Sequence, residues 1–197
     1  MEALVNAQRS MGLPHATVLV VSNKPNASGL EKATRLDLPS LVVEHIRDGE
    51  NISRKEHELE IIKGLANHDV ELIVLAGYMR LLSPVFLNEW QHRIVNIHPS
   101  LLPHFPGGHA HRDVLASKSS ITGCTVHLVD EGMDTGAVLA QRAVPVFDGD
   151  DEISLSDRVK VEEHRLYPEV LTWIAEGRVH LTERGVLVQD ETDRCVC

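Results

Sequence analysis

Asn96 and His98 are the residues whose types and spacing indicate chemistry most directly. They end an apolar run that begins at Ile94, and on an extended chain both side chains leave the strand on the same face. Pro99 cannot donate to a central strand ladder, so it predicts that the strand stops there. An amide and an imidazole can donate two hydrogen bonds to one carbonyl oxygen. The pair therefore predicts a site that activates a carbonyl group.

The elements that must position this pair alternate between strands and helices. Apolar runs predict strands over residues 16–21, 41–43, 71–76 and 94–97, and helical patterns fall between them. Near-continuous apolar strands separated by helices are typical of a parallel sheet covered on both faces. The sequence therefore predicts an α/β fold of the Rossmann-like kind, with a mostly parallel twisted sheet and helices on both faces.

Two serines mark helix starts. Ser53, with Glu56 three residues later, forms a capping box and predicts a helix over residues 53–66. Ser83 followed by Pro84 predicts the start of a second, shorter helix. The first of these helices has apolar residues along one face, which we expect to turn toward the core: Leu59, Ile62 and Leu65.

The second half of the chain predicts longer strands than the first half. Residues 122–129 and 137–146 predict two longer strands, joined by an acidic loop over residues 130–136. A long helix over residues 154–176 and a closing hairpin around residues 183–185 are expected to follow.

Bulk composition narrows the class of protein. The 197 residues, 43% of them hydrophobic, are expected to form one domain, 1–197, that needs no disulfide. Three irregularly spaced cysteines, Cys124, Cys195 and Cys197, favour a reducing compartment, so we expect a cytoplasmic protein. No run approaches the ~18 apolar residues of a membrane span. A net charge of −10 disfavours binding to nucleic acid and favours small-molecule substrates.

The chain begins with a helical pattern over residues 1–8 that Gly12 ends. Doubly wound sheets usually begin with a strand and a glycine-rich turn, which delivers a phosphate to a helix N-terminus. In this chain both would lie before Met1. We therefore expect a domain that is incomplete at the N-terminus, with its first strand and phosphate loop missing, and we hypothesise that the true start lies upstream.

Three motifs carry a resemblance to a known family. They are residues 96–103, 106–112 and 133–136, and in this order they resemble the glycinamide ribonucleotide formyltransferases. The resemblance covers nearly the whole chain. It implies transfer of the formyl group of 10-formyltetrahydrofolate, a cosubstrate, to the amine of glycinamide ribonucleotide in purine biosynthesis. It also implies a catalytic set: Asn96, His98 and Asp134.

The chemistry of formyl transfer agrees with this set. A formyl group that moves between two nitrogens passes through a tetrahedral adduct, whose negative oxygen needs preorganised donors. The amide of Asn96 and a protonated His98 can supply them. A carboxylate at Asp134 would orient the charged imidazole and relay a proton from the attacking amine to the folate nitrogen. Each residue alone has a structural explanation, such as a turn at Asp134, but their order and neighbours favour catalysis.

Residues 76–84 follow an apolar strand, at the edge where open α/β sheets bind their ligands. By resemblance this segment is the folate-binding edge, and the acidic loop closes over the pterin ring. For the single side chains, a solvated arginine beside core residues remains the alternative, as does an exposed helix charge for Arg54. The folate-binding residues that the resemblance implies are Met79, Arg80, Leu81, Leu82, Asp130, Asp134 and Arg54.

The resemblance also implies residues that bind the ribonucleotide. Glu163, which precedes His164 in the late helix, would hold the glycinamide end, and an exposed helix charge is the alternative. Histidines 98, 104, 109 and 111 lie close in sequence, but no carboxylate or thiolate stands beside them at ligand spacing, so we expect no metal. The implied substrate-binding residues are Asn96, Pro99, Gly107, His109 and Glu163.

Other activities share parts of this pattern. A formyltetrahydrofolate hydrolase could use the same trio with water as acceptor, although its relatives usually carry an extra N-terminal domain. A methionyl-tRNA formyltransferase is disfavoured by the acidic balance and by the lack of a basic C-terminal domain. The third alternative is a catalytically impaired remnant that binds folate. Without the phosphate loop, each lost contact to the phosphate costs about 1.5 to 3 kcal/mol of binding free energy. We expect a monomer or homodimer with small-molecule substrates and no nucleic-acid or membrane partner.

Overall fold

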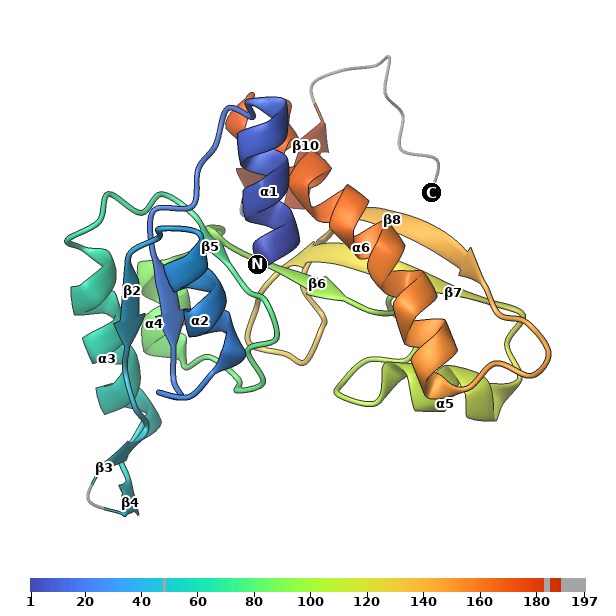
Figure 1. Ribbon diagram of the computed structural model, residues 1–197, viewed down its shortest axis with the longest axis horizontal. Coiled ribbons are helices and arrows are strands. Elements are labelled where there is room, and N and C mark those ends of the chain that lie inside the picture. Colours follow the sequence, from blue (N-terminus) through green and yellow to red (C-terminus); the bar gives the residue numbers. More distant parts are fainter. Residues whose placement is uncertain (48, 183–184, 189–197) are drawn as a thin grey trace.

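The strand that carries Asn96 and His98 lies inside a four-stranded sheet (Figure 1). The computed structural model describes residues 1–47, 49–182 and 185–188. In sheet order the four strands are β5 (Ile73–Val74), β6 (Ile94–His98), β7 (Ile121–Leu128) and β8 (Val138–Pro145).

The sheet is mixed. Strand β5 pairs in parallel with β6, whereas the pairs β6–β7 and β7–β8 are antiparallel. A separate parallel pair consists of β1 (Val20–Ser22) and β2 (Ser40–Val42). The α/β class is confirmed, but the expectation of a mostly parallel sheet holds only for β1–β2 and β5–β6. The acidic loop over residues 130–136 returns the chain from β7 to β8 as a hairpin, which makes that pair antiparallel.

Strands β1 and β5 are shorter than the apolar runs over residues 16–21 and 71–76 predict. Within the described residues, each has a hydrogen-bonded neighbour on one side only, which is β2 for β1 and β6 for β5. A run with one neighbour has fewer backbone partners that hold it extended. The longer β7 has a strand on each side, and it extends over nearly the whole predicted length.

The part of the chain that the structure describes contains six helices. None of them is long and apolar enough to cross a membrane. They are α1 (Glu2–Met11), α2 (Ser28–Arg35), α3 (Arg54–Leu65), α4 (Pro84–Glu89), α5 (Ala110–Ser117) and α6 (Glu152–Ala175).

Local signals in the sequence set several helix ends. Gly12 adopts a φ of +61° and ends α1, as predicted. The Ser53 hydroxyl accepts a hydrogen bond from the Glu56 backbone nitrogen at the start of α3. Helix α6 begins two residues before its predicted start because Asp151 and Ser154 form a capping box.

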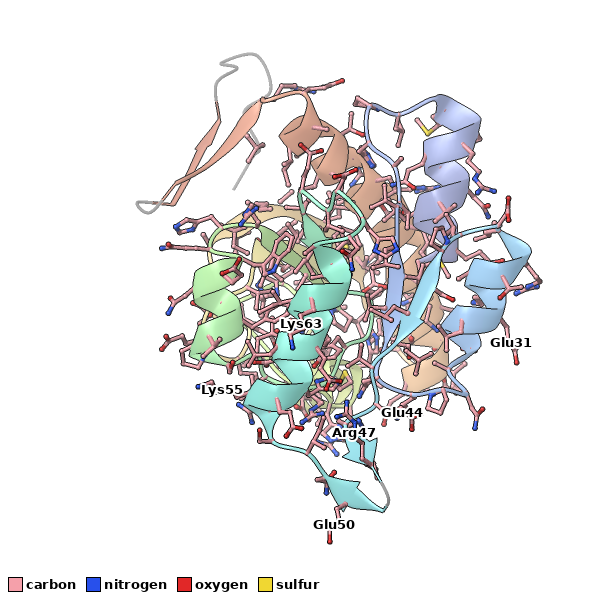
Figure 2. All side chains as sticks on the ribbon, turned by 90° about the vertical axis from the view of Figure 1, so that its left-hand side faces the viewer. Glu31, Glu44, Arg47, Glu50, Lys55 and Lys63 are labelled. Atoms are coloured by element: carbon pink, nitrogen blue, oxygen red, sulfur yellow. The ribbon has the colours of Figure 1, made fainter. Side chains whose placement is uncertain are left out.

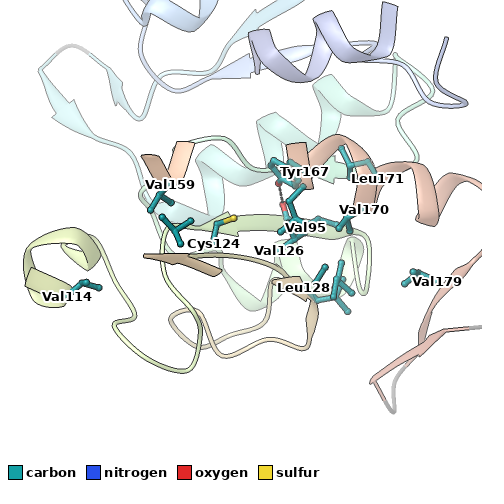
Figure 3. Packing of buried hydrophobic residues seen from close by; sticks show 14 of the residues in the cluster. Val95, Val114, Cys124, Val126, Leu128, Val159, Tyr167, Val170, Leu171 and Val179 are labelled. Carbon is teal, nitrogen blue, oxygen red and sulfur yellow. Dashed lines mark hydrogen bonds between the residues drawn. The ribbon is translucent and has the colours of Figure 1, made fainter. Parts of the chain in front are cut away.

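Two clusters of buried side chains lie on the two faces of the sheet. Ile94 packs in the cluster beneath α3 and α4, whereas Val95 belongs to the cluster beneath α6 (Figure 3). Ile97 packs against the same cluster as Val95. Because side chains alternate along a strand, Asn96 and His98 point away from the α6 face, both to the same side, as predicted.

Tyr167 fastens α6 to this sheet. Its hydroxyl lies 2.9 Å from the carbonyl oxygen of Leu75 and 3.0 Å from that of Val95 (Figure 3). The two carbonyls belong to neighbouring chain segments, so one buried side chain fixes the helix over the strand that carries Asn96.

Two short hairpins complete the architecture. Arg47 ends β3 (Ile46–Arg47), which pairs with β4 (Glu50–Asn51), and its guanidinium forms ion pairs with Glu56 and Glu60 of α3 (Figure 2). Near the C-terminus, β9 (Val179–Thr182) pairs with β10 (Gly185–Val188), as the predicted hairpin requires. Residues 183–184 of its turn lie outside the described residues.

Candidate active site

His98 and Asp134 lie side by side, although α5 and β7 stand between them in the sequence. His98 Nδ1 lies 3.3 Å from Asp134 Oδ2, and the two side chains are 5% and 14% exposed. His98 ends β6, and Asp134 stands in the loop between β7 and β8 with a left-handed φ of +56°. Because β6 and β7 are antiparallel, the chain leaves β7 beside the start of β6, where the Val129 backbone nitrogen donates to the Ile94 carbonyl, and the loop itself then brings Asp134 to His98.

The second ring nitrogen of His98 also has a partner. Nε2 lies 2.8 Å from the backbone oxygen of Phe105. Each nitrogen therefore faces an oxygen that can only accept, a carboxylate on one side and a carbonyl on the other. The ring is therefore held between the loop that joins β7 to β8 and the loop that follows β6.

The structure adds His127 to the site, a residue that sequence reasoning missed. His127 lies opposite Asn96 in the β6–β7 register, and its Nε2 is 3.2 Å from Asn96 Nδ2. Its Nδ1 lies 2.7 Å from the carbonyl oxygen of Leu128. The signal was a single imidazole inside the apolar run that ends at Val129, a position at which only nonpolar side chains are expected in a buried strand.

His127 is a neutral acceptor. Burial lowers its pKa below the ordinary value, and this effect outweighs the Leu128 carbonyl and the Asp134 charge, which raise it. With its one hydrogen directed from Nδ1 to Leu128, Nε2 has a free lone pair for Asn96. The Asn96 amide must then present its NH2 end to His127, which leaves a second N–H and the amide oxygen for other partners.

One oxygen of Asp134, Oδ2, faces two nitrogen atoms, and the other lies near the neutral His127 ring. Besides His98, the Gly107 backbone nitrogen donates to Oδ2 at 2.8 Å, and Oδ1 lies 3.6 Å from His127 Nε2. Gly107 adopts a φ of +88°, which favours a residue without a side chain. The structure thus brings the predicted trio together, with Gly107 of the predicted substrate-binding set beside it.

Thr125 holds the loop that follows His98. Its hydroxyl donates to the Ser100 carbonyl at 2.6 Å and accepts from the Leu102 backbone nitrogen at 3.0 Å. Gln141 Nε2 lies 2.8 Å from the same hydroxyl and 2.9 Å from the Leu102 carbonyl. Because this network lies at the end of β6, it fixes the path of the chain between His98 and Gly107.

The predicted folate-binding edge is open to solvent in part. Met79 and Leu81 are 77% and 46% exposed, whereas Leu82 packs against the core beneath α3 and α4. Arg80 has a buried Nη1 without a hydrogen-bond partner among the described residues. Arg54 is exposed at the first position of α3.

Asp130 shapes the acidic loop. Its Oδ1 accepts hydrogen bonds from the Gly132 backbone nitrogen at 3.0 Å and from the Thr135 hydroxyl at 2.7 Å. Such a carboxylate fixes the turn that leads to Asp134. The hydrogen bonds that the structure describes for Asp130 therefore all stay within the loop.

Three further predicted residues lie around this centre. His109 is the N-cap of α5 and is exposed, and Pro99 follows the end of β6. Glu163 lies on α6, which covers the opposite face of the sheet from Asn96 and His98, and no described contact joins it to the trio. Burial raises the pKa of Glu163.

Within the described residues, no group of three or more His, Cys, Asp or Glu side chains is arranged to hold a metal ion. The histidines at 98 and 127 instead meet oxygen and amide partners of the protein. The arrangement is that of hydrogen-bond donors and one carboxylate around a common point.

Comparison with known proteins agrees with this geometry. The family described as formyl transferase matches residues 1–171. The phosphoribosylglycinamide formyltransferase of Escherichia coli is 37% identical, over 94% of this chain and 86% of that protein. The trifunctional purine biosynthetic protein adenosine-3 of Drosophila melanogaster is 45% identical, but the chain spans only 13% of its length.

A solved structure is similar over almost the whole chain. Glycinamide ribonucleotide transformylase 1 from Symbiobacterium toebii has a TM-score of 0.89 at 39% identity, and the match covers 96% of this chain and 88% of that one. The match in sequence and the match in fold point to the same group of proteins. The chain belongs to the formyl transferase family.

Proposed function

We propose that this chain transfers the formyl group of 10-formyltetrahydrofolate to the amine of glycinamide ribonucleotide, a step of purine biosynthesis. The observation that carries the proposal is the convergence of Asn96, His98 and Asp134 at the end of β6. Relatives named phosphoribosylglycinamide formyltransferase, at 37% identity or more over most of the chain, support it.

The reaction needs one carbon–nitrogen bond to form and one to break. The amine attacks the formyl carbon, and the carbonyl oxygen becomes an oxyanion in the tetrahedral adduct. The free N–H of Asn96 and the charged ring of His98 donate to this oxygen. The adduct then releases the folate nitrogen, which takes up a proton as the former amine loses one.

Asp134 is the residue that relays this proton. Its Oδ2 is engaged by His98 Nδ1 and the Gly107 backbone nitrogen, whereas among the described residues Oδ1 has only the long contact to His127. Oδ1 is therefore the oxygen that accepts a proton from the attacking amine and returns it to the folate nitrogen, directly or through water.

The loop over residues 99–109 takes part in this geometry. The formyl oxygen competes with the Phe105 carbonyl for the Nε2 hydrogen of His98. Substrate binding therefore replaces a contact within the protein by one to the reacting oxygen, without a change in the charge of the ring.

The folate is assigned to the segment over residues 76–82. Met79 and Leu81 offer exposed apolar surface to the pterin ring, and Arg54 and Arg80 supply positive charge beside it. The nucleotide is assigned to Pro99, Gly107 and His109, and Glu163, which the resemblance adds to this set, lies on α6 at the other face of the sheet. We propose a cytoplasmic protein, a monomer or homodimer, that acts on small molecules only.

The test is to incubate the purified chain with 10-formyltetrahydrofolate, with and without glycinamide ribonucleotide, and to follow deformylation by absorbance. Turnover that requires the nucleotide supports the transferase. Turnover in water alone supports the hydrolase instead. If the folded chain binds the folate but turns over neither mixture, it is a binding protein and the proposal fails.

A further inference from the structure

Two methionines lie against the same pair of glycines beside Asp134. Met79 and Met133 are 77% and 56% exposed. A methyl group built on Gly107 would lie 3.2 Å from the sulfur of Met133, and one built on Gly108 would lie 3.4 Å from the terminal methyl of Met79. The two thioethers thus reach this segment from separate loops, one before and one after it in the sequence.

We propose that Met133 is a site of reversible oxidation, at which a sulfoxide separates the Gly107 backbone from the Asp134 carboxylate. Met79, which lies near Gly108, is a second site of oxidation at the same segment. The effect on turnover rests on the proposed function, because it acts through Asp134. The oxidation itself and the displacement of Gly107 do not depend on that function.

The chemistry requires a hydroperoxide as oxidant. The thioether sulfur attacks one peroxide oxygen, a sulfur–oxygen bond forms and the oxygen–oxygen bond breaks. The departing oxygen leaves as water or an alcohol after it takes up a proton. The sulfur is oxidised by two electrons and the peroxide is reduced by two, and a methionine sulfoxide reductase returns the thioether.

The position of Met133 explains why the added oxygen matters. A Cβ added to Gly107 would lie only 3.2 Å from its sulfur, so an oxygen added to the sulfur on that side comes close to the Gly107 backbone. A sulfoxide oxygen is also a strong acceptor, which competes for the Gly107 N–H that now donates to Asp134 Oδ2 at 2.8 Å. Met133 directly precedes Asp134, whose φ of +56° leaves few alternative conformations for the loop.

The described thiol is a poor competitor for the oxidant. Cys124 is fully buried, and burial raises its pKa to about 12, so it carries almost no thiolate at neutral pH. Met11 serves as a matched control, because it is 71% exposed at the end of α1, away from the loop that joins β7 to β8 (Figure 1).

The experiment exposes the purified chain to graded hydrogen peroxide and maps sulfoxides by peptide mass spectrometry. Formyl transfer is measured for the unaltered chain and for Met133→Leu, Met79→Leu and Met11→Leu, each relative to its own untreated rate. Amide hydrogen exchange of the peptide that contains Gly107 is measured on the same samples. A final step adds a methionine sulfoxide reductase with dithiothreitol, or dithiothreitol alone.

We expect activity to fall about tenfold in step with sulfoxide at Met133, the equivalent of one lost hydrogen bond. Exchange at Gly107 should rise in parallel, and only the reductase should restore both. Met133→Leu should resist the treatment, whereas Met11→Leu should be as sensitive as the unaltered chain. A bound folate analogue should slow oxidation of Met79 and Met133 but not of Met11.

Equal loss of activity in Met133→Leu, or recovery with dithiothreitol alone, would overturn the proposal. So would full oxidation of Met133 with no change in exchange at Gly107. If the untreated chain has no transferase activity, the proposed function fails, and the exchange measurement still decides whether the sulfoxide moves Gly107.

Discussion

The side-chain nitrogen of Asn96 lies 3.2 Å from Nε2 of His127, directly across the β6–β7 pairing. An amide can turn by 180° about its terminal bond, and only one orientation places N–H groups where an oxyanion needs them. Because His127 is a neutral acceptor, it selects that orientation. His127 thus determines which groups of the Asn96 amide remain available to other partners.

Replacement of His127 should therefore lower turnover. In His127→Leu the amide has no acceptor that fixes it, and we expect kcat to fall about tenfold with little change in KM. In His127→Gln the side-chain oxygen can still accept, and this variant should recover part of the rate. Steady-state kinetics check this, after circular dichroism has shown that both variants fold. Equal rates in both variants would contradict the orienting role.

The trio itself should show larger effects. We expect Asn96→Ala to lose on the order of a hundredfold in kcat, because one donor to the oxyanion disappears. Asp134→Asn should lose about a hundredfold or more, because an amide cannot relay the proton. Single-turnover rates with both substrates saturating are the measurement. A loss below tenfold in both would remove these residues from the chemical step.

Glu58 should control the folate-binding edge from inside the protein. Its buried carboxylate accepts hydrogen bonds from the Ser83 backbone nitrogen at 2.9 Å and from the Ser83 hydroxyl, at the end of residues 76–82. We expect Glu58→Leu to cost about 1–3 kcal/mol of stability. It should also raise KM for the folate more than KM for the nucleotide. Glu58→Gln, which retains one acceptor, is the control, and parallel changes in both KM values would refute the local role.

Stability should fall on acidification. Burial is the main cause that lowers the pKa of five histidines below their ordinary value of 6.5: His15, His57, His111, His127 and His164. Below about pH 6.5 the unfolded chain therefore binds more protons than the folded chain, so the free energy of unfolding decreases as pH falls. Urea unfolding between pH 7.5 and 5.5 measures the slope. His57→Gln should make it shallower, and a stability that rises toward pH 5.5 would contradict this.

Cys124 should be unreactive in the folded protein. Its thiol is fully buried, with a pKa raised by burial to about 12. In a variant with Cys195→Ser and Cys197→Ser, a disulfide reagent at pH 8 should find no fast-reacting thiol, and it should find one after denaturation. Rapid labelling of the native variant would show that β7 opens far more often than its burial implies.

The placement of Asn96 and His98 on β6 could be predicted because it depends on local rules. Period-two spacing places Asn96 and His98 on one face, and Pro99 ends the strand after them. His127 could not be found in this way, since its importance depends on the register between β6 and β7. Register is a long-range property, and an imidazole in an apolar run gives no sign of which residue lies across from it.

Helix α3 shows a second limit of pattern reasoning. Its apolar residues predicted a buried face with Leu59, but Leu59 is 39% exposed, whereas His57 and Glu58 are fully buried. The hydrophobic pattern counts a carboxylate as a surface group. Glu58 is buried because Ser83 supplies its hydrogen bonds, and Ser83 lies 25 residues away in the sequence.

The separation of β1–β2 from the four-stranded sheet affects how the protein unfolds. No backbone hydrogen bond of the described residues joins β1 to β5, so side chains of the cluster beneath α3 and α4 make the connection. Packing of this kind is less directional than a strand ladder. Loss of the β1–β2 pair would therefore leave the strand that carries Asn96 with both of its hydrogen-bonded neighbours, β5 and β7.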